Sequence, residues 1–241
     1  MEPMTGRPFV TAVVLAGGSG VRFGADVPKQ FLDLVGQPML AHALAAFERT
    51  TEVAATVVVL PVERPPFVDL ALAGLAKVTS VTNGGPTRQA SLSEGLVCLP
   101  EETDIVLVHD AARPAVQPSL ITRVAGALGD DDPDATYDGA IPAIPVDDAL
   151  KEVTGEGLVV GRRSRVGLWR AQTPQGFRRD CIEDALARAD AEGVLCEDCA
   201  ELAVRAGYRV RVVPGDPVNL KATRREDLRL LEAIMAGSLH G

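Results

Sequence analysis

Short apolar, β-branched runs alternate with amphipathic segments of helical periodicity along the first half of the chain. The apolar runs cover residues 9–15, 54–60, 77–82 and 104–109, and the amphipathic segments cover residues 39–49, 87–98 and 119–128. Continuous apolar strands separated by helices are typical of βαβ units, in which a parallel sheet is covered on both faces. The pattern predicts an α/β fold, a three-layer sandwich around a mostly parallel, doubly wound sheet.

The pattern changes after Pro145. Two strand-like runs, residues 149–153 and 158–162, flank the glycine-containing turn at 154–157, and this predicts an inserted β-hairpin. Further helices are predicted over residues 178–191, 198–206 and 225–236, and a further strand over residues 209–213. Because no repeat or low-complexity linker divides the sequence, we expect one domain over residues 1–241, with residues 145–165 as a projecting arm.

Composition and charge exclude several classes of protein. The 24 basic and 33 acidic side chains give a net charge of −9, whereas nucleic acids and acidic membranes are bound mainly by clustered Lys and Arg. The most apolar stretch, residues 54–60, is far shorter than the roughly 20 residues that span a bilayer, and residues 1–8 lack the apolar segment of a signal peptide. We expect a cytoplasmic protein that binds neither nucleic acid nor membrane, so an anionic ligand must meet a local basic pocket.

The four cysteines are too few for a disulfide scaffold at this length. Cys196 and Cys199 form a C-x-x-C pair, which would suit a redox pair or half of a metal site. However, Cys98 and Cys181 are isolated, and the three histidines are scattered along the chain. We therefore interpret the cysteines as helix-packing thiols.

The strongest chemical signal is the glycine-rich segment directly after the first predicted strand, residues 15–22 (LAGGSGVR). Glycines let a phosphate approach the backbone, and successive N–H groups form an anion-binding nest. The dinucleotide fingerprint is absent because Phe23 stands where it needs glycine, which disfavours a nicotinamide-dependent dehydrogenase, and the P-loop ending G-K-[ST] is absent too. Arg22 and Lys29 supply two nearby cations. The alternative is a tight strand-to-helix turn with exposed charges.

Five blocks in a fixed order carry a resemblance to a known family. The first, A-G-G-x-G-x-R followed by residues 28–31 (PKQF), is similar to the sugar-phosphate nucleotidyltransferases. The later blocks are residues 84–91 (GGPTRQAS), 108–114 (VHDAARP), 168–175 (LWRAQTPQ) and 215–223 (GDPVNLKAT). Together they resemble the 2-C-methyl-D-erythritol 4-phosphate cytidylyltransferases of the non-mevalonate isoprenoid pathway, over nearly the whole chain.

The resemblance implies a Rossmann-like fold and transfer of CMP from CTP to 2-C-methyl-D-erythritol 4-phosphate, with release of pyrophosphate. Because the substrate phosphate is itself the nucleophile, such a site needs cations and backbone donors rather than a nucleophilic side chain. The residues that match the family's catalytic cations are Arg22, Lys29 and Lys221. Those expected to bind nucleotide are Ala16, Gly17, Gly18, Gly20, Gly85, Arg88, Ser91 and Asp110. Those expected to bind the polyol phosphate are Arg113, Arg165 and Thr173.

The reaction also implies a divalent cation, Mg²⁺ or another, between the α-phosphate and the leaving pyrophosphate. Such ions take one or two carboxylates together with phosphate oxygens. Asp110, at the end of a predicted strand, is the expected ligand, and Asp216 is a second candidate. The alternatives are that Asp110 caps a helix or pairs with Arg113, and that Asp216 is an ordinary turn residue. We expect His109 to be structural and Trp169, the only tryptophan, to lie in the core.

In the family, the arm crosses to a second subunit, so the resemblance implies a homodimer in which Arg165 serves the neighbouring active site. The alternative is a solvated surface hairpin. Two departures concern the polyol: Ala149 stands where members commonly have Thr, and Glu197 stands in place of the Thr of T-D-[DE]-[AC]. Because side-chain hydroxyls that bind the substrate help to select it, their absence affects which polyol phosphate is used more than the type of reaction. They leave open a cytidylyltransferase for another polyol phosphate, such as D-ribitol 5-phosphate, and an inactive CTP-binding scaffold.

Overall fold

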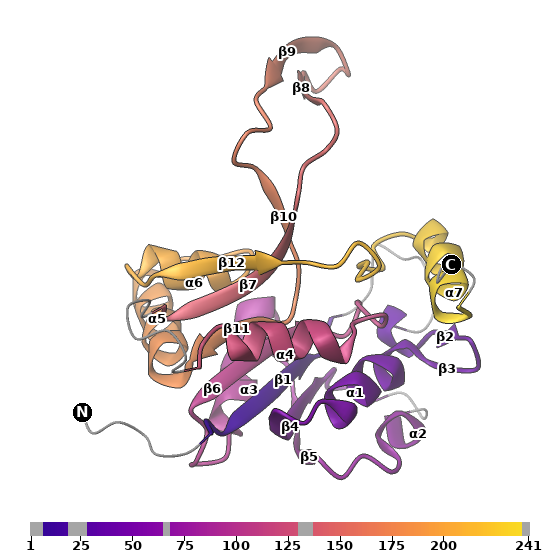
Figure 1. Ribbon diagram of the computed structural model, residues 1–241, viewed down its shortest axis with the longest axis vertical. Coiled ribbons are helices and arrows are strands. Elements are labelled where there is room, and N and C mark those ends of the chain that lie inside the picture. The colour runs from indigo at the N-terminus through magenta and orange to yellow at the C-terminus, as the bar shows by residue number, and fades with distance from the viewer. Residues whose placement is uncertain (1–6, 19–27, 65–67, 130–136, 238–241) are drawn as a thin grey trace.

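The structure is a computed structural model that describes residues 7–18, 28–64, 68–129 and 137–237. Its centre is an eight-stranded sheet in the order β10-β7-β11-β6-β1-β4-β5, with β12 paired to β7 (Figure 1). The strands are β1 (Val10–Leu15), β4 (Val53–Leu60), β5 (Val78–Asn83), β6 (Ile105–Asp110), β7 (Gly139–Pro145), β10 (Trp169–Ala171), β11 (Gln175–Arg178) and β12 (Val210–Pro214). The pairings make β10 and β11 run opposite to the other six strands.

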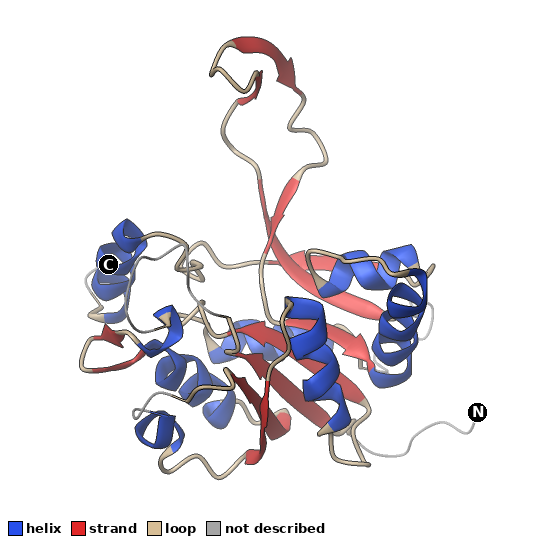
Figure 2. Cartoon of the chain, turned by 180° about the vertical axis from the view of Figure 1, so that it is seen from behind, coloured by secondary structure: helices blue, strands red, loops and turns tan. Residues whose placement is uncertain are grey.

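Helices cover both faces of the sheet, as Figure 2 shows from behind. One face carries α1 (Met39–Arg49) and α4 (Pro118–Gly126), and the other carries α3 (Arg88–Val97), α5 (Arg179–Glu192) and α6 (Cys199–Arg205). Side chains alternate between the two faces along each strand: Ala12 and Val14 of β1 pack with α1 and α4, whereas Val13 packs with α3 and α5. The predicted three-layer α/β fold with a mostly parallel sheet is confirmed.

The remaining elements lie outside these layers or at their edges. They are α2 (Val68–Leu72), α7 (Arg225–Met235), the short 3₁₀ helix η2 (Lys29–Phe31) and the small hairpin of β2 (Asp33–Leu34) and β3 (Gln37–Pro38). Leu231 and Ile234 of α7 pack with Leu34 and Met39 in a separate apolar cluster. This cluster fixes α7 against β2 and the start of α1. No helix in the described residues is long and apolar enough to cross a membrane.

Strands β7, β10 and β11 lie in a region where the sequence pattern predicted none. Strand β7 contains Pro142 and Pro145, and proline argues against a strand in the middle of a sheet because it cannot donate to the ladder. Here β7 is nevertheless paired on both sides, with β12 and with β10 and β11. The partners are short and distant in sequence, so local periodicity does not reveal them.

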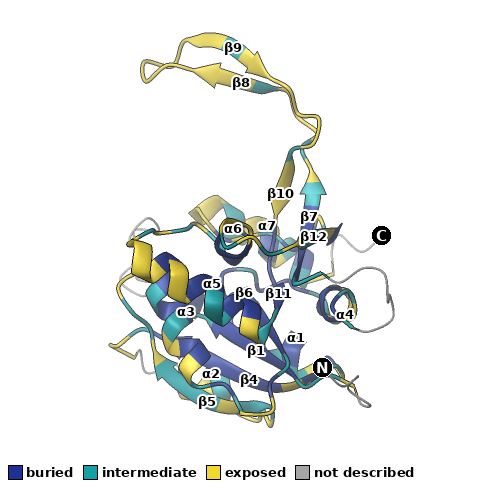
Figure 3. Cartoon of the chain, turned by 90° about the vertical axis from the view of Figure 1, so that its left-hand side faces the viewer, coloured by how far each residue is buried: buried dark blue, intermediate teal, exposed yellow. Residues whose placement is uncertain are grey.

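The predicted hairpin is confirmed, as β8 (Leu150–Val153) and β9 (Val159–Arg163) joined through residues 154–158. Gly157 has a φ of +86°, and its N–H donates to the Thr154 carbonyl at 3.0 Å, so the turn needs a residue that tolerates the left-handed region. The hairpin stands off the body on the extensions of β7 and β10, and almost all of its surface is exposed (Figure 3).

The prediction that Trp169 lies in the core is wrong. The residue is 50% exposed, because β10 rises out of the body toward the arm, beyond the helices that cover the sheet (Figure 3). The four cysteines are free. Cys181 and Cys199 are buried in α5 and α6, where they act as packing residues.

Candidate active site

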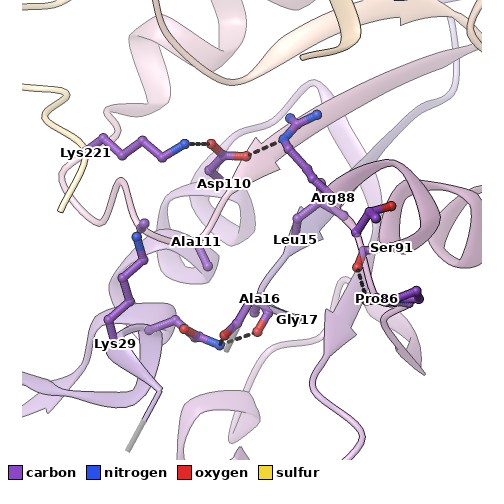
Figure 4. Close-up of a pocket in the computed structure, with 15 residues that line it drawn as sticks. Leu15, Ala16, Gly17, Lys29, Pro86, Arg88, Ser91, Asp110, Ala111 and Lys221 are labelled. Carbon is purple, nitrogen blue, oxygen red and sulfur yellow. Dashed lines mark hydrogen bonds and ion pairs between the residues drawn. The ribbon is translucent and has the colours of Figure 1, made fainter. Parts of the chain in front are cut away.

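A pocket of about 400 Å³ opens where β1, β5 and β6 end. The carboxyl ends of parallel strands are where open α/β sheets bind ligands, because the loops that follow neighbouring strands meet there. Five separate segments of the chain form the walls (Figure 4). The lining residues are Leu15, Ala16, Gly17, Gly18, Lys29, Gln30, Gly85, Pro86, Thr87, Arg88, Ser91, Asp110, Ala111, Ala112 and Lys221.

The glycine-rich segment after β1 forms the floor of the pocket, between β4 and the segment that follows β5. The Ala16 N–H donates to the Val59 carbonyl at 2.7 Å, which continues the β1–β4 pairing by one residue. A Cβ on Gly17 would lie 3.3 Å from Ser91 Oγ and 3.4 Å from Gly84 Cα, so the backbone passes close to the segment after β5. The predicted residues Gly20 and Arg22 lie outside the described residues.

The start of α3 forms the second wall. Thr87 caps the helix, since its side chain accepts a hydrogen bond from the Ala90 N–H at 3.0 Å. A Cβ on Gly85 would lie only 2.5 Å from Ala90 Cβ, which explains why glycine stands there. Ser91 donates to the Gly85 carbonyl at 3.3 Å, so both residues predicted to bind nucleotide are fixed at the pocket.

Asp110, at the end of β6, holds two cations over the pocket. Its two carboxylate oxygens pair with Arg88 Nε at 3.2 Å and with Lys221 Nζ at 2.5 Å, and its side chain is only 13% exposed. Burial alone would raise the pKa of this carboxyl, but Arg88 and Lys221 outweigh that effect and hold the pKa well below its ordinary value. Of the alternatives for Asp110, an ion pair is what forms, with Arg88 and Lys221 rather than Arg113.

Arg88 has a second contact behind the pocket, because its Nη1 donates to the buried Cys199 Sγ at 3.4 Å. Burial opposes the charge of this guanidinium, but Cys199 and Asp110 more than offset that, so its pKa stays above the ordinary value. Arg88 is therefore a permanent cation held between β6 and α6.

The catalytic lysines predicted from the resemblance come together from opposite ends of the chain. Lys29 Nζ donates to the Ala222 carbonyl at 2.9 Å, and Ala222 is anchored in turn by its N–H bond to the Ala112 carbonyl at 2.8 Å. Because Ala222 directly follows Lys221, η2 and the segment that carries Lys221 fix each other's position. Both lysines line the pocket.

Thr173 and Arg113 lie behind Asp110 rather than in the pocket lining. The buried Thr173 hydroxyl contacts His109 Nδ1 at 3.0 Å and accepts from the Asp110 N–H at 3.2 Å. Arg113 donates to the carbonyls of Asn219 and Ala171 at 2.8 and 3.2 Å. His109 is fully buried, and burial lowers its pKa to about 4. These groups position the strand end that carries Asp110.

Besides Thr173 and Arg113, two further predicted residues do not line the pocket of this chain. Arg165 lies in the arm, where it donates to the Asp147 carbonyl. Asp216 is not among the lining residues; its carboxylate accepts from the Val218 N–H at 3.0 Å, as a turn residue does. Among the described residues, no group of three or more His, Cys, Asp or Glu side chains forms a ready-made metal site. Asp110 is the carboxylate that faces the pocket.

Three buried glutamines that the sequence pattern does not single out support the site. Gln30 donates to the carbonyls of Ala16 and Gly18 at 2.5 and 2.9 Å. Gln172 exchanges two hydrogen bonds with the backbone of Asp216, and Gln175 accepts from the N–H groups of Cys199 and Ala200. Buried amides need partners for both ends. The glutamines lie inside the PKQF and QTPQ blocks, which was the one signal in the sequence that they matter. Because their hydrogen-bond partners are distant in sequence, their supporting role could not be predicted.

Comparison with known proteins assigns this arrangement to a class: the chain is a nucleotidyltransferase that uses CTP, a cytidylyltransferase. Residues 10–237 match the family described as 2-C-methyl-D-erythritol 4-phosphate cytidylyltransferase, and the chain belongs to that family. The family's activity is a step of the non-mevalonate isoprenoid pathway.

Individual relatives are similar to this chain over nearly its whole length. A 2-C-methyl-D-erythritol 4-phosphate cytidylyltransferase of Burkholderia vietnamiensis is 43% identical over 98% of this chain and 99% of its own length. The crystal structure of the Thermus thermophilus enzyme of that name is 34% identical, with a TM-score of 0.76 over 92% of this chain and 98% of that one. A synthase structure from Anaerococcus prevotii, with a TM-score of 0.80 at 24% identity over 96% of this chain and all of that one, shows the same fold.

Proposed function

We propose that the pocket at the ends of β1, β5 and β6 transfers CMP from CTP to 2-C-methyl-D-erythritol 4-phosphate and releases pyrophosphate. One observation carries the assignment of residues: the glycine-rich segment, the start of α3 and the cations Lys29, Arg88 and Lys221 line a single pocket. Three cations against the carboxylate of Asp110 leave an excess of positive charge. That excess suits a triphosphate in a protein whose net charge is −9.

The lysines act on the charge that develops during the reaction. A phosphate oxygen of the polyol phosphate attacks the α-phosphorus of CTP while the bond to pyrophosphate breaks, so negative charge accumulates between two polyanions. Lys29 and Lys221 stabilise that charge without accepting or losing a proton. Arg22, outside the described residues, is the third cation that the resemblance assigns to this role. Asp110 orients Lys221 and Arg88 beforehand, which lowers the cost of reorganisation.

Nucleotide binding falls to the floor and the second wall of the pocket. Ala16, Gly17, Gly18 and Gly85 present backbone groups, Ser91 presents a hydroxyl, and Arg88 presents a cation. Gly20 belongs to the same group on the basis of sequence. Thr173 contacts His109 and Asp110 at the end of β6, and Arg113 contacts the carbonyls of Asn219 and Ala171. Both residues would therefore bind the polyol phosphate beside this end of β6.

A divalent cation, Mg²⁺ in the first instance, fits the residues present. Asp110 offers an ionised carboxylate to the pocket, and Mg²⁺ commonly takes one carboxylate and completes its shell with phosphate oxygens and water. When bound, the ion supplies charge neutralisation at the triphosphate. Asp216 is the weaker ligand candidate because its carboxylate is engaged in a turn away from the pocket.

The arm suits a partner subunit. We propose a single domain over residues 1–241 whose arm, residues 145–165, reaches a second copy of the chain and brings Arg165 to that copy's polyol phosphate. Two features support this: Arg165 is remote from the pocket of its own chain, and the arm exposes Val153, Leu158 and Val159. Exposed apolar side chains grouped on a projecting segment are typical of an interface.

The test is pyrophosphate release from CTP and Mg²⁺ by the purified protein. We expect release when 2-C-methyl-D-erythritol 4-phosphate is added and little with D-ribitol 5-phosphate. A preference for ribitol phosphate would assign the departures at Ala149 and Glu197 to substrate choice and overturn the proposed acceptor. CTP binding without turnover on either compound would support the inactive scaffold.

A further inference from the structure

Gln30 contacts the glycine-rich segment from the side opposite to α3. Figure 4 places Lys29, its neighbour in sequence, on one side of Ala16 and Gly17, and Ser91 and Pro86 on the other. Gln30 is only 3% exposed, and its amide nitrogen donates to the carbonyls of Ala16 and Gly18. An amide NH₂ group has two N–H donors, so both are used on the segment that forms the pocket floor.

The turn that carries Gln30 is held by its own backbone and by contacts with two other parts of the molecule. The Phe31 N–H donates to the Pro28 carbonyl at 2.9 Å, which closes a single 3₁₀ turn. Phe31 packs into the core beside α1, and Lys29 donates to the Ala222 carbonyl. Consecutive side chains of this turn therefore contact the C-terminal segment, the glycine-rich segment and the core, and this holds the Gln30 amide where it is.

These two hydrogen bonds determine which way the peptide groups of the floor point. A trans peptide is planar, with its C=O and N–H on opposite sides, so the N–H of Gly17 points away from Gln30 once the Ala16 carbonyl points toward it. The Ala16 N–H is already used by Val59. No hydrogen bond within the described residues takes the Gly17 N–H. That donor is thus left for a ligand.

We propose that Gln30 is a positioning residue for the nucleotide: its amide holds the Ala16 and Gly18 carbonyls so that the Gly17 N–H faces CTP. The proposal rests on the proposed function, in which this segment binds CTP. Without the amide, the two carbonyls lose a buried donor, and the peptide groups rotate to find other partners, which removes the preorganised donor from the pocket.

Two substitutions of Gln30 test the proposal. Gln30→Glu keeps the shape of the side chain but presents an acceptor to two carbonyls, and Gln30→Met removes the donor without adding charge. We expect calorimetry to show the Kd for CTP with Mg²⁺ rising by about tenfold in both, in line with the loss of an oriented hydrogen bond. The KM for 2-C-methyl-D-erythritol 4-phosphate should stay within about twofold.

Gln89→Met is the matched control. Gln89 is likewise buried, at 5% exposure, and its amide donates to Asp190 Oδ1 and the Val194 carbonyl, away from the glycine-rich segment. Its loss should lower the melting temperature about as much as Gln30→Met does and leave the Kd for CTP at the wild-type value. A general loss of stability would instead weaken CTP binding in both variants and overturn the positioning role.

Gly18→Phe separates this proposal from the proposed function. A Cβ on Gly18 meets no atom within 4 Å, and Gly18 lines the pocket, so a ring there obstructs the pocket of a folded protein. If Gly18→Phe weakens CTP binding and folded Gln30 variants bind CTP like the wild type, the role of Gln30 is wrong and the site stands. If Gly18→Phe also binds CTP normally, the glycine-rich segment is not the nucleotide site, and both proposals fail.

Discussion

The pocket and the arm differ in how their polar and apolar groups are satisfied within one chain. Around the pocket, Asp110 has a cation on each oxygen, and Gln30, Gln172 and Thr173 are buried with defined hydrogen-bond partners. On the arm, valines and a leucine are exposed, and Arg165 contacts a backbone carbonyl of the arm itself. The difference is that the polar groups at the pocket find their partners within one chain, whereas the apolar side chains of the arm find no cover within it.

The largest effect that would separate the two regions is expected from Lys221→Ala. We expect turnover to fall by about 10²–10³-fold, because a cation aimed at the developing charge is lost, while Asp110 keeps its pair with Arg88 and the protein stays folded. Pyrophosphate release and thermal unfolding measure the two quantities. Arg205→Ala removes an exposed cation that pairs with Glu192 and does not line the pocket, and it should leave the rate unchanged. A near-normal rate in Lys221→Ala contradicts its assigned role.

The pH dependence of stability should arise in the body behind the pocket. His109 has a folded pKa of about 4 because it is buried, whereas the unfolded chain takes up the proton near its ordinary value of 6.5. Between these values the unfolded state binds more protons, so stability falls as pH drops from about 6.5 to 4, by on the order of 3 kcal/mol. Urea unfolding across this range measures it. His109→Gln should flatten the slope, and an unchanged slope would contradict the assignment.

The proposed contribution of the arm to a neighbouring site can be tested by mixing two variants, each of which turns over slowly on its own at low polyol phosphate concentration. Arg165→Ala should raise the KM for the polyol phosphate by about tenfold or more and leave the KM for CTP unchanged, because a single charged contact is lost. When Arg165→Ala is mixed and re-equilibrated with Lys221→Ala, half of the dimers combine the two chains, and each such dimer regains one intact site. We expect about a quarter of wild-type activity to return. No recovery in dimers shown to exchange subunits would mean that Arg165 serves its own chain.

The smallest effect on the fold is expected from Val159→Asp in the arm. The side chain is exposed, so unfolding of the monomer should change by no more than about 0.5 kcal/mol. The same change places a charge in the proposed interface and should shift the monomer–dimer equilibrium toward monomer, as sedimentation would show. If Val159→Asp leaves the mass in solution at that of the wild-type dimer, this part of the arm is not buried between subunits.

Sequence reasoning succeeded where the signal was local. The periodicity predicted β1, β4 and β6 and placed α1 over residues 39–49, where the structure has it. It failed at β7, whose prolines disfavour a central strand until its three partner strands are in place, and at Trp169, whose size suggested the core while its strand leads out to the arm.

In the candidate site, too, the residues within local motifs were predicted and those that depend on distant contacts were not. Motif order was enough to bring Lys29, Arg88, Asp110 and Lys221 to one pocket. The supporting role of Gln30 depends on carbonyls 12 and 14 residues away, and no periodicity reports such a contact. The resemblance supplied a role for Asp216, but its carboxylate is taken by a turn, which composition and spacing do not show.

The hydrogen bond between Lys29 and the Ala222 carbonyl joins positions 193 residues apart. During synthesis, the glycine-rich segment, η2 and the ends of β5 and β6 leave the ribosome long before their last partner. The pocket is therefore among the final parts of the protein to form, and a nascent chain that has most of its sheet but lacks the segment of Lys221 still lacks one wall of it.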